Sequence, residues 1–213
     1  VKSGPEKCAG GHPSPKINIP TFTQKMMPLQ SLIVLLVFTL LGVIFFSRVM
    51  ILSGSGVSLV GLPPIEKRYY YTGKGAVITT WGLFIVKAIF PFLGYIRTPD
   101  PLAWTAIVLL LAGSTLLTLS FLQLGTSLRM GIPIESTTLH RTGAYRFSRN
   151  PIYTGIHLVS AGSCFYFPDL LNITLALYGI WAHHRIILAE ERFLADRFGT
   201  EWEEYAAMVK RYF

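Results

Sequence analysis

Two long stretches without a formal charge place the strongest constraint on how this chain can fold. Met26–Ser47 and Pro101–Leu128 contain no Asp, Glu, Lys or Arg. A helix needs about 20 apolar residues to cross the hydrocarbon core of a membrane. Only 14% of the residues are charged and the mean hydropathy is +0.47, whereas soluble domains carry about 25% charged residues. We therefore expect an all-α integral membrane protein.

Three further apolar stretches complete the predicted set of membrane spans. They are Ala76–Ile96, Pro151–Phe167 and Leu170–Leu188. Pro168-Asp169 separates the last two, which predicts a tight helical hairpin. Lys87 falls inside the first of these stretches, where a lysine usually faces the bundle or extends to the interface. The pattern predicts a bundle of about five transmembrane helices.

The chain divides into three parts by composition. Residues 1–28 form a polar N-terminal tail, 29–124 hold three predicted transmembrane helices, and 125–213 hold a polar loop, the hairpin and a C-terminal helix. Gly199 is expected to end the fifth helix, and Thr200 with Glu203 fits a capping box. The following residues place Trp202, Tyr205, Val209 and Tyr212 on one helical face. This cytoplasmic amphipathic helix would lie against the bundle or the headgroups, or close an active site.

The distribution of basic residues predicts the orientation. With five spans, the loop at 54–75, the loop at 125–150 and the C-terminus share one face, which carries eleven Lys and Arg. The opposite face carries five. Because basic residues accumulate on the cytoplasmic side, we expect the eleven-charge face to be cytoplasmic and the N-terminus to lie outside.

The net charge of +8 fits a membrane surface better than nucleic acid, because the basic residues flank apolar segments. The two cysteines have no CxxC spacing and the histidines have no metal-ligand spacing, so no metal site is predicted. We expect the partners to be membrane lipids and a lipid-like or apolar small-molecule acceptor.

Two polar elements go beyond what membrane insertion requires. They are residues 137–155 and 183–199, which lie at opposite ends of one predicted hairpin and therefore on the same face. Asn150-Pro151 is typical of a helix start, with Asn as the cap and Pro at the first helical position. Glu190 and Glu191 fit either a solvated helix end or acceptors for ribose hydroxyls or an amino group. From the residues alone both roles remain open.

Both elements resemble a known family. GAYRFSRNPIYTG, at 143–155, resembles a signature of the isoprenylcysteine carboxyl methyltransferase and phospholipid methyltransferase superfamily. The segments AEERFLADRFGTEWEEY and VKRYF resemble the closing pattern of that superfamily. The resemblance covers about residues 120–213. Asn150 stands where many members have His, so a proton-handling role is not expected at this position.

The resemblance implies a pocket for S-adenosylmethionine between the loop before the fourth span and the end of the fifth. The implied cofactor contacts are Thr137, Thr138, Leu139, His140, Tyr145, Asn150, Pro151, Tyr153, Glu190 and Glu191. A family arginine that faces the acceptor corresponds most nearly to Arg185, one residue out of register, and Arg149 is the second candidate.

The resulting hypothesis is direct in-line methyl transfer from S-adenosylmethionine to a lipid-associated or apolar acceptor. The acceptor would be a carboxylate of isoprenylcysteine type, a phospholipid amine or a thiol. Orienting two reactants contributes about 7–11 kcal/mol to such a step. Two alternatives remain at this stage. Gly199–Trp202 also resembles the ending of NADPH-dependent sterol reductases, and the chain could be a non-enzymatic membrane lipid-binding protein.

Overall fold

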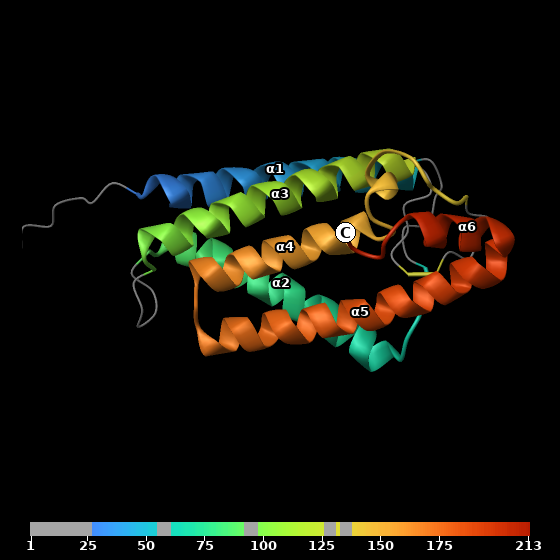
Figure 1. Ribbon diagram of the computed structural model, residues 1–213. Coiled ribbons are helices and arrows are strands. Elements are labelled where there is room, and N and C mark those ends of the chain that lie inside the picture. The colour runs from blue at the N-terminus through green and yellow to red at the C-terminus, as the bar shows by residue number, and fades with distance from the viewer. Residues whose placement is uncertain (1–26, 55–60, 92–97, 126–130, 133–137) are drawn as a thin grey trace, which may run out of the picture.

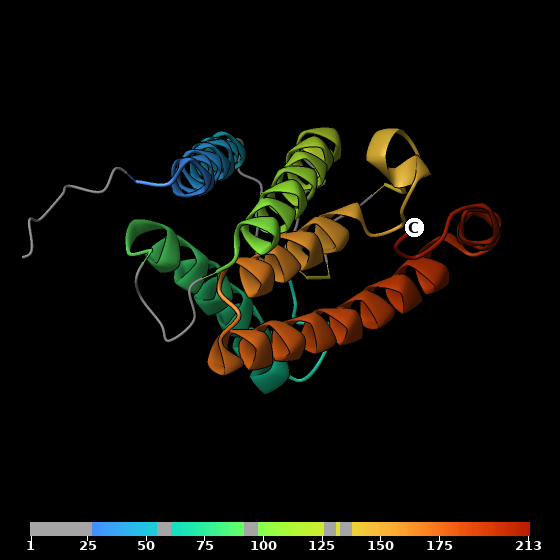
Figure 2. The same ribbon diagram turned by 60° about the vertical axis from the view of Figure 1, so that its left-hand side comes forward.

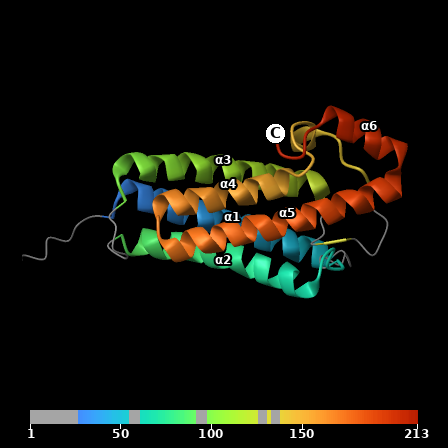
Figure 3. The ribbon, with the colours of Figure 1, turned by 60° about the horizontal axis from the view of Figure 1, so that its bottom comes forward.

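The computed structural model describes residues 27–54, 61–91, 98–125, 131–132 and 138–213, and these residues form an all-helical bundle. Five long helices lie alongside one another, and a short one crosses one end of the bundle (Figures 1 and 3). The helices are α1 (Leu29–Gly54), α2 (Lys67–Ile89), α3 (Asp100–Leu124), η2 (Gly143–Arg146, a 3-10 turn), α4 (Pro151–Tyr166), α5 (Leu170–Phe198) and α6 (Thr200–Met208).

Two of these helices are long and apolar enough to cross a membrane by length and composition, α1 and α3. On α1, large apolar side chains point outward at helical spacing, and each is at least half exposed: Leu32, Leu36, Leu40, Val43, Phe46 and Met50. Such a continuous apolar stripe is suited to contact with lipid. A count of five spans goes beyond this finding and stays a prediction.

The helices begin close to where the sequence predicts, with one clear difference. Two of them end elsewhere: α1 ends at Gly54, beyond the predicted Ser47, and α2 ends at Ile89, before the predicted Ile96. α2 begins at Lys67, nine residues before the expected start at Ala76. Hydropathy sets only the apolar part of a helix, whereas this helix continues outward because it packs on α5. A Cβ at Gly73 would lie 2.3 Å from the Cβ of Ala182, so the two helices touch there. The extra turns bring Lys74 beside the polar end of α5.

Side-chain hydrogen bonds stabilise the turn of the α4–α5 hairpin. The side chain of Asp169 accepts a hydrogen bond from the backbone N–H of Leu171 and caps α5. The buried Asn172 side chain donates to the carbonyls of Ser163 and Phe167. Each of these carbonyls also accepts a backbone N–H, from Phe167 and Asp169 respectively, so the Asn172 amide adds a second bond at each. Lys87 is also buried at this end, with its ammonium 5.5 Å from the centre of the Phe167 ring, so it faces the bundle.

The predicted capping box at Thr200 is wrong. Thr200 is the first residue of α6, no side chain caps the helix, and Gly199 occupies the N-cap position with a φ of 51°. The Gly199 carbonyl accepts from the N–H groups of Trp202 and Glu203 instead. Because Gly199 turns the chain in a left-handed conformation, α6 follows α5 without a spacer. The helix ends at Met208, so the predicted helical face does not extend to Val209 and Tyr212.

The hydrophobic core lies between α1, α2, α3 and α4, toward the end of the bundle away from α6. α3 and α4 approach closely there, because a Cβ at Gly113 would lie 2.8 Å from the Gly155 carbonyl oxygen. Figure 2 shows α3 and α4 crossing side by side, with α1 at the margin. Small residues at helix contacts allow this approach in membrane bundles.

We predict that Gly113→Ala destabilises the bundle by about 1–3 kcal/mol, because the new methyl group meets backbone that cannot move away. Thermal denaturation in detergent measures the effect. Gly82→Ala is the control, because a Cβ at Gly82 meets nothing within 4 Å and alanine favours a helix. Equal melting temperatures for the two variants would contradict the close packing of α3 on α4.

Candidate active site

A cavity of about 590 Å³ lies at the end of the bundle beneath α6. This volume falls within the range of about 300–1,000 Å³ that is usual for small-molecule sites. Its polar wall is formed by Lys74, Thr138, His140, Tyr145, Arg149, Asn150, Tyr153, His183 and Glu190. Its remaining walls come from α1, α2, α3 and α4 and are apolar apart from Arg48 of α1, while Trp202 and Tyr205 of α6 close one side.

The 3-10 turn holds Tyr145 against this cavity. Gly143 has a φ of 62°, and a Cβ there would collide with the Gln123 side chain. The Gln123 Oε1 accepts a hydrogen bond of 2.8 Å from the N–H of Ala144. The Tyr205 hydroxyl donates to the Tyr145 carbonyl at 2.7 Å. Burial raises the pKa of Tyr145, so its ring stays neutral. The turn is therefore fixed from both α3 and α6.

Glu190 presents its carboxylate to the cavity just beyond the apolar part of α5, which ends at Leu188. The Tyr153 hydroxyl donates to its Oε1 at 2.9 Å. Burial raises the pKa of Glu190 to about 7, although the Tyr153 hydroxyl and the Lys74 ammonium oppose that rise. Burial lowers the pKa of Lys74, and the Glu190 charge opposes that change. This buried carboxylate would be stabilised further by a cation.

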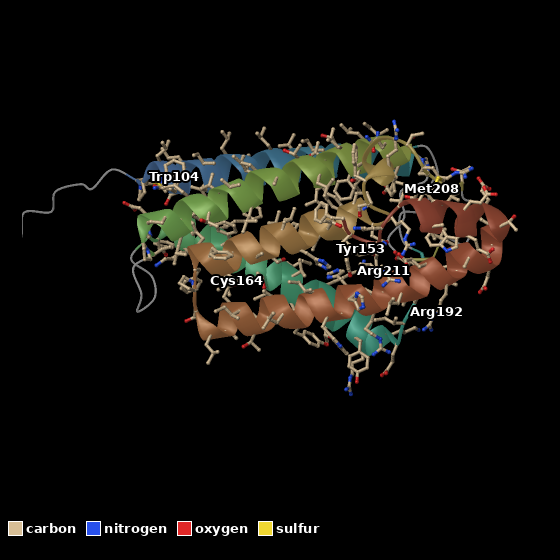
Figure 4. The ribbon with its side chains drawn as sticks, in the orientation of Figure 1. Trp104, Tyr153, Cys164, Arg192, Met208 and Arg211 are labelled. Atoms are coloured by element: carbon tan, nitrogen blue, oxygen red, sulfur yellow. The ribbon has the colours of Figure 1, made fainter. Side chains whose placement is uncertain are left out.

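Glu191 faces a different direction and organises the C-terminus. Its carboxylate accepts hydrogen bonds from Arg211 at 2.8 and 3.0 Å and from the Asn150 amide at 2.8 Å. The Arg149 Nε lies 3.2 Å from its Oε1. Figure 4 labels Tyr153 and Arg211, which contact the adjacent Glu190 and Glu191. Neighbouring residues on a helix point about 100° apart, which separates the roles of these two acids.

The Glu191 network also fixes the residue that starts α4. Asn150 occupies the N-cap position and Pro151 the first helical position, as predicted, but no side-chain cap bond forms. The Asn150 amide donates to Glu191 instead of capping. A carboxylate is a stronger acceptor than a neutral group, and a side-chain amide donor cannot satisfy a helix N–H. The predicted capping role of the Asn150 side chain is therefore wrong.

His183 lines the cavity about two helical turns before Glu190 on α5. Its Nδ1 lies 2.9 Å from the carbonyl oxygen of Gly179. A carbonyl can only accept, so this bond requires a proton on Nδ1 and leaves Nε2 of the neutral ring with a lone pair. His183 is buried, and its ring centre lies 5.5 Å from that of Tyr153. The arrangement provides a proton acceptor next to the Glu190–Tyr153 pair.

The family model of phospholipid methyltransferases matches residues 102–201, which run from α3 to the start of α6. The polar lining residues fall within this match, except for Arg48 of α1, Lys74 of α2 and the lining residues of α6 beyond residue 201. No curated protein matches the chain, and no solved structure matches it.

Residues 102–201, just under half of the chain, match the phospholipid methyltransferase family. The resemblance stated from the two sequence motifs is thereby confirmed. The chain is a membrane methyltransferase that uses S-adenosylmethionine.

The structure brings most of the predicted site residues of this methyltransferase to one cavity. They are Thr138, Leu139, His140, Tyr145, Arg149, Asn150, Pro151, Tyr153 and Glu190. Glu191 is not among the lining residues, because its carboxylate faces the C-terminal segment. Arg185 is also outside the lining. It is exposed on α5, with its guanidinium 5.8 Å from the Trp181 ring centre. Thr137 lies outside the described residues.

Several lining residues of the methyltransferase were not found from the sequence. They are Lys74, which falls in the basic loop at 54–75, His183, for which a structural or interfacial role is the expectation, and Arg48, for which the sequence predicts no role. In sequence, each of them is a polar residue near the end of an apolar helix. Such a position is equally compatible with an interfacial, a structural or a functional role. The packing of α2 on α5 and of α1 on α3 is what directs these side chains into the cavity.

We predict that Glu191→Gln destabilises the protein by about 3 kcal/mol, because it leaves Arg149 and Arg211 without a counter-charge in a mostly buried site. Thermal denaturation at pH 8 measures the loss. Glu190→Gln is the matched control. Since the pKa of Glu190 is raised in the folded state, its ionisation opposes folding above pH 4.5 and a neutral amide costs no stability. A larger loss in Glu190→Gln would contradict this assignment.

Proposed function

We propose that this protein transfers a methyl group from S-adenosylmethionine to the amine of a phospholipid headgroup. The observation that carries the proposal is one cavity with two ends. Glu190 and Tyr145 form its polar end, and apolar side chains of α1, α2 and α3 form the other. A headgroup and an acyl chain need such a pairing of surfaces. The family match supports a phospholipid-type acceptor.

The residues at the polar end fit the cofactor. Glu190 is a buried carboxylate that a cationic amino group would stabilise, and its assignment as the amino-group contact is our proposal. Tyr145 and His140, with ring centres 6.3 Å apart, would hold the adenosine by their flat faces. Trp202 and Tyr205 would exclude water from the other side. When bound, S-adenosylmethionine supplies an activated methyl group. The bond from this methyl to the acceptor forms as its bond to sulfur breaks, and the electron pair of the broken bond stays on sulfur.

An amine acceptor must first lose a proton. A lysine-type amine has a pKa of about 10.4, so only a small fraction is free at neutral pH. We propose that Nε2 of His183 takes this proton, because Nδ1 is held by the Gly179 carbonyl. A positioned base contributes about 10²–10⁴-fold to a proton transfer. Arg185, which the family resemblance places nearest the acceptor, does not line the cavity, so its position does not support an ion pair with an acceptor carboxylate.

We further propose that the cavity opens to the cytoplasmic side, with the N-terminus outside. The end of the bundle that holds the cavity also carries the basic residues of the α2 start, the η2 turn and the C-terminus, including Arg68, Arg146 and Lys210. Lys and Arg gather on the cytoplasmic side of membrane proteins. This orientation would place the cofactor site in the compartment that contains S-adenosylmethionine.

We predict that affinity for S-adenosylhomocysteine, which keeps the amino group, falls about tenfold from pH 8 to pH 6. The reason is that Glu190, with a pKa of about 7, loses its charge over this range. Calorimetry in detergent measures the affinity. Glu190→Gln should bind weakly and without pH dependence, whereas Tyr145→Ala should bind weakly but keep it. Equal pH dependence in wild type and Glu190→Gln would contradict the role of Glu190.

We predict that the purified protein transfers labelled methyl groups from S-adenosylmethionine to phosphatidylethanolamine in mixed micelles, but not to the carboxylate of a farnesylcysteine. His183→Asn keeps a donor for the Gly179 carbonyl and removes Nε2. It should lower kcat about 100-fold at pH 7, with recovery at higher pH and unchanged S-adenosylhomocysteine affinity. Methylation of farnesylcysteine alone would refute the amine assignment, and an unchanged kcat would refute the base.

A further inference from the structure

The apolar end of the cavity contains one charged side chain. Arg48, near the C-terminal end of α1, lines the cavity together with Phe45, Leu41 and Phe38 of the same helix. These three residues lie 3, 7 and 10 positions before Arg48, so all four share one helical face. At 1.5 Å per residue, their backbone positions lie about 5–15 Å from that of Arg48 along the helix axis, toward the bundle interior.

The Arg48 guanidinium lacks a protein counter-charge within the described part of the chain. Its Nη2 makes one long contact, 3.5 Å to the carbonyl oxygen of Phe121. Its Nε is buried and has no hydrogen-bond partner. Among residues 27–54, 61–91, 98–125, 131–132 and 138–213, no carboxylate lies within ion-pair distance of it. A guanidinium offers five N–H donors, and leaving a buried donor unpaired costs about 1–3 kcal/mol or more.

The other cations of the cavity are engaged. Lys74 faces Glu190 and packs over the ring of Tyr70, 4.3 Å from its centre. Arg149 contacts Glu191 and donates to the Ala206 carbonyl at 2.9 Å. Arg48 therefore differs from both, because its site is built from a cation and apolar surface alone. An anionic group attached to an apolar chain is the ligand that matches this combination.

We propose that Arg48 binds the phosphate of the acceptor lipid, an inference that rests on the proposed function. A guanidinium pairs with two oxygens of a phosphate at once, which fixes the orientation of the headgroup. Acyl chains attached to this phosphate would extend along Phe45, Leu41 and Phe38. The headgroup amine would extend across the cavity toward His183 and the cofactor end. Arg48 thus distinguishes phospholipids from apolar amines without phosphate.

The test uses Arg48→Met, which keeps the apolar stem and removes the charge. Arg192→Met is the matched control, because Arg192 is an exposed arginine that does not line the cavity. We would measure kcat and KM for phosphatidylethanolamine, the competitive inhibition constant of phosphatidic acid, and the affinity for S-adenosylhomocysteine. Phosphatidic acid carries the phosphate and the chains but no amine, so it reports phosphate recognition without chemistry.

Arg48→Met should raise KM for phosphatidylethanolamine and the inhibition constant of phosphatidic acid at least tenfold, as expected for a lost charge-assisted bond. Its S-adenosylhomocysteine affinity should stay within twofold of wild type, and Arg48→Lys should recover part of the loss. Unchanged lipid constants would overturn the proposal. Weakened S-adenosylhomocysteine binding would also overturn it, by assigning Arg48 to the cofactor carboxylate. A wild-type protein that binds S-adenosylhomocysteine but methylates no phospholipid would instead refute the proposed function itself.

Discussion

The carboxylate of Glu191 is the interaction on which the arrangement of the site depends. It binds Arg211 from the end of the chain and Arg149 and Asn150 from the start of α4. It thereby joins α5 both to the start of α4 and to the C-terminal segment. Along the chain, α6 lies between α5 and that segment. Because all three donors converge on one acid, removing its charge would leave two cations unpaired at once. The same contacts leave the neighbouring Glu190 as the acid that faces the cavity.

Burial sets the chemistry of the cavity more than any single contact does. Glu190 is ionisable near neutral pH because the surrounding helices exclude water from it, while Tyr153 and Lys74 limit that effect. The same exclusion keeps Tyr145 neutral. A buried acid with a raised pKa suits a site that binds a cationic cofactor, because the positive charge of the ligand stabilises the ionised carboxylate.

The two ends of the cavity come from different parts of the chain. The polar end is built from the matched family region, 102–201, together with Lys74. The apolar end includes α1, which lies outside that match. We therefore expect cofactor binding to follow the family pattern, whereas α1 would decide which acceptor enters. Substitution of Arg48 on α1 tests this division, because it should change acceptor binding and leave cofactor binding unchanged.

The sequence by itself determined the helical membrane architecture, the hairpin at Pro168-Asp169 and the family, because long apolar runs and a spaced motif are local properties. It also identified most of the polar residues of the cavity wall, from Thr138 to Tyr153 and Glu190. It could not separate Glu190 from Glu191, or direct Lys74, His183 and Arg48 inward. Those roles depend on the rotation of each helix and on which neighbour it packs against. Only the tertiary structure decides these, since a helix with polar residues on several sides has no single preferred face in sequence.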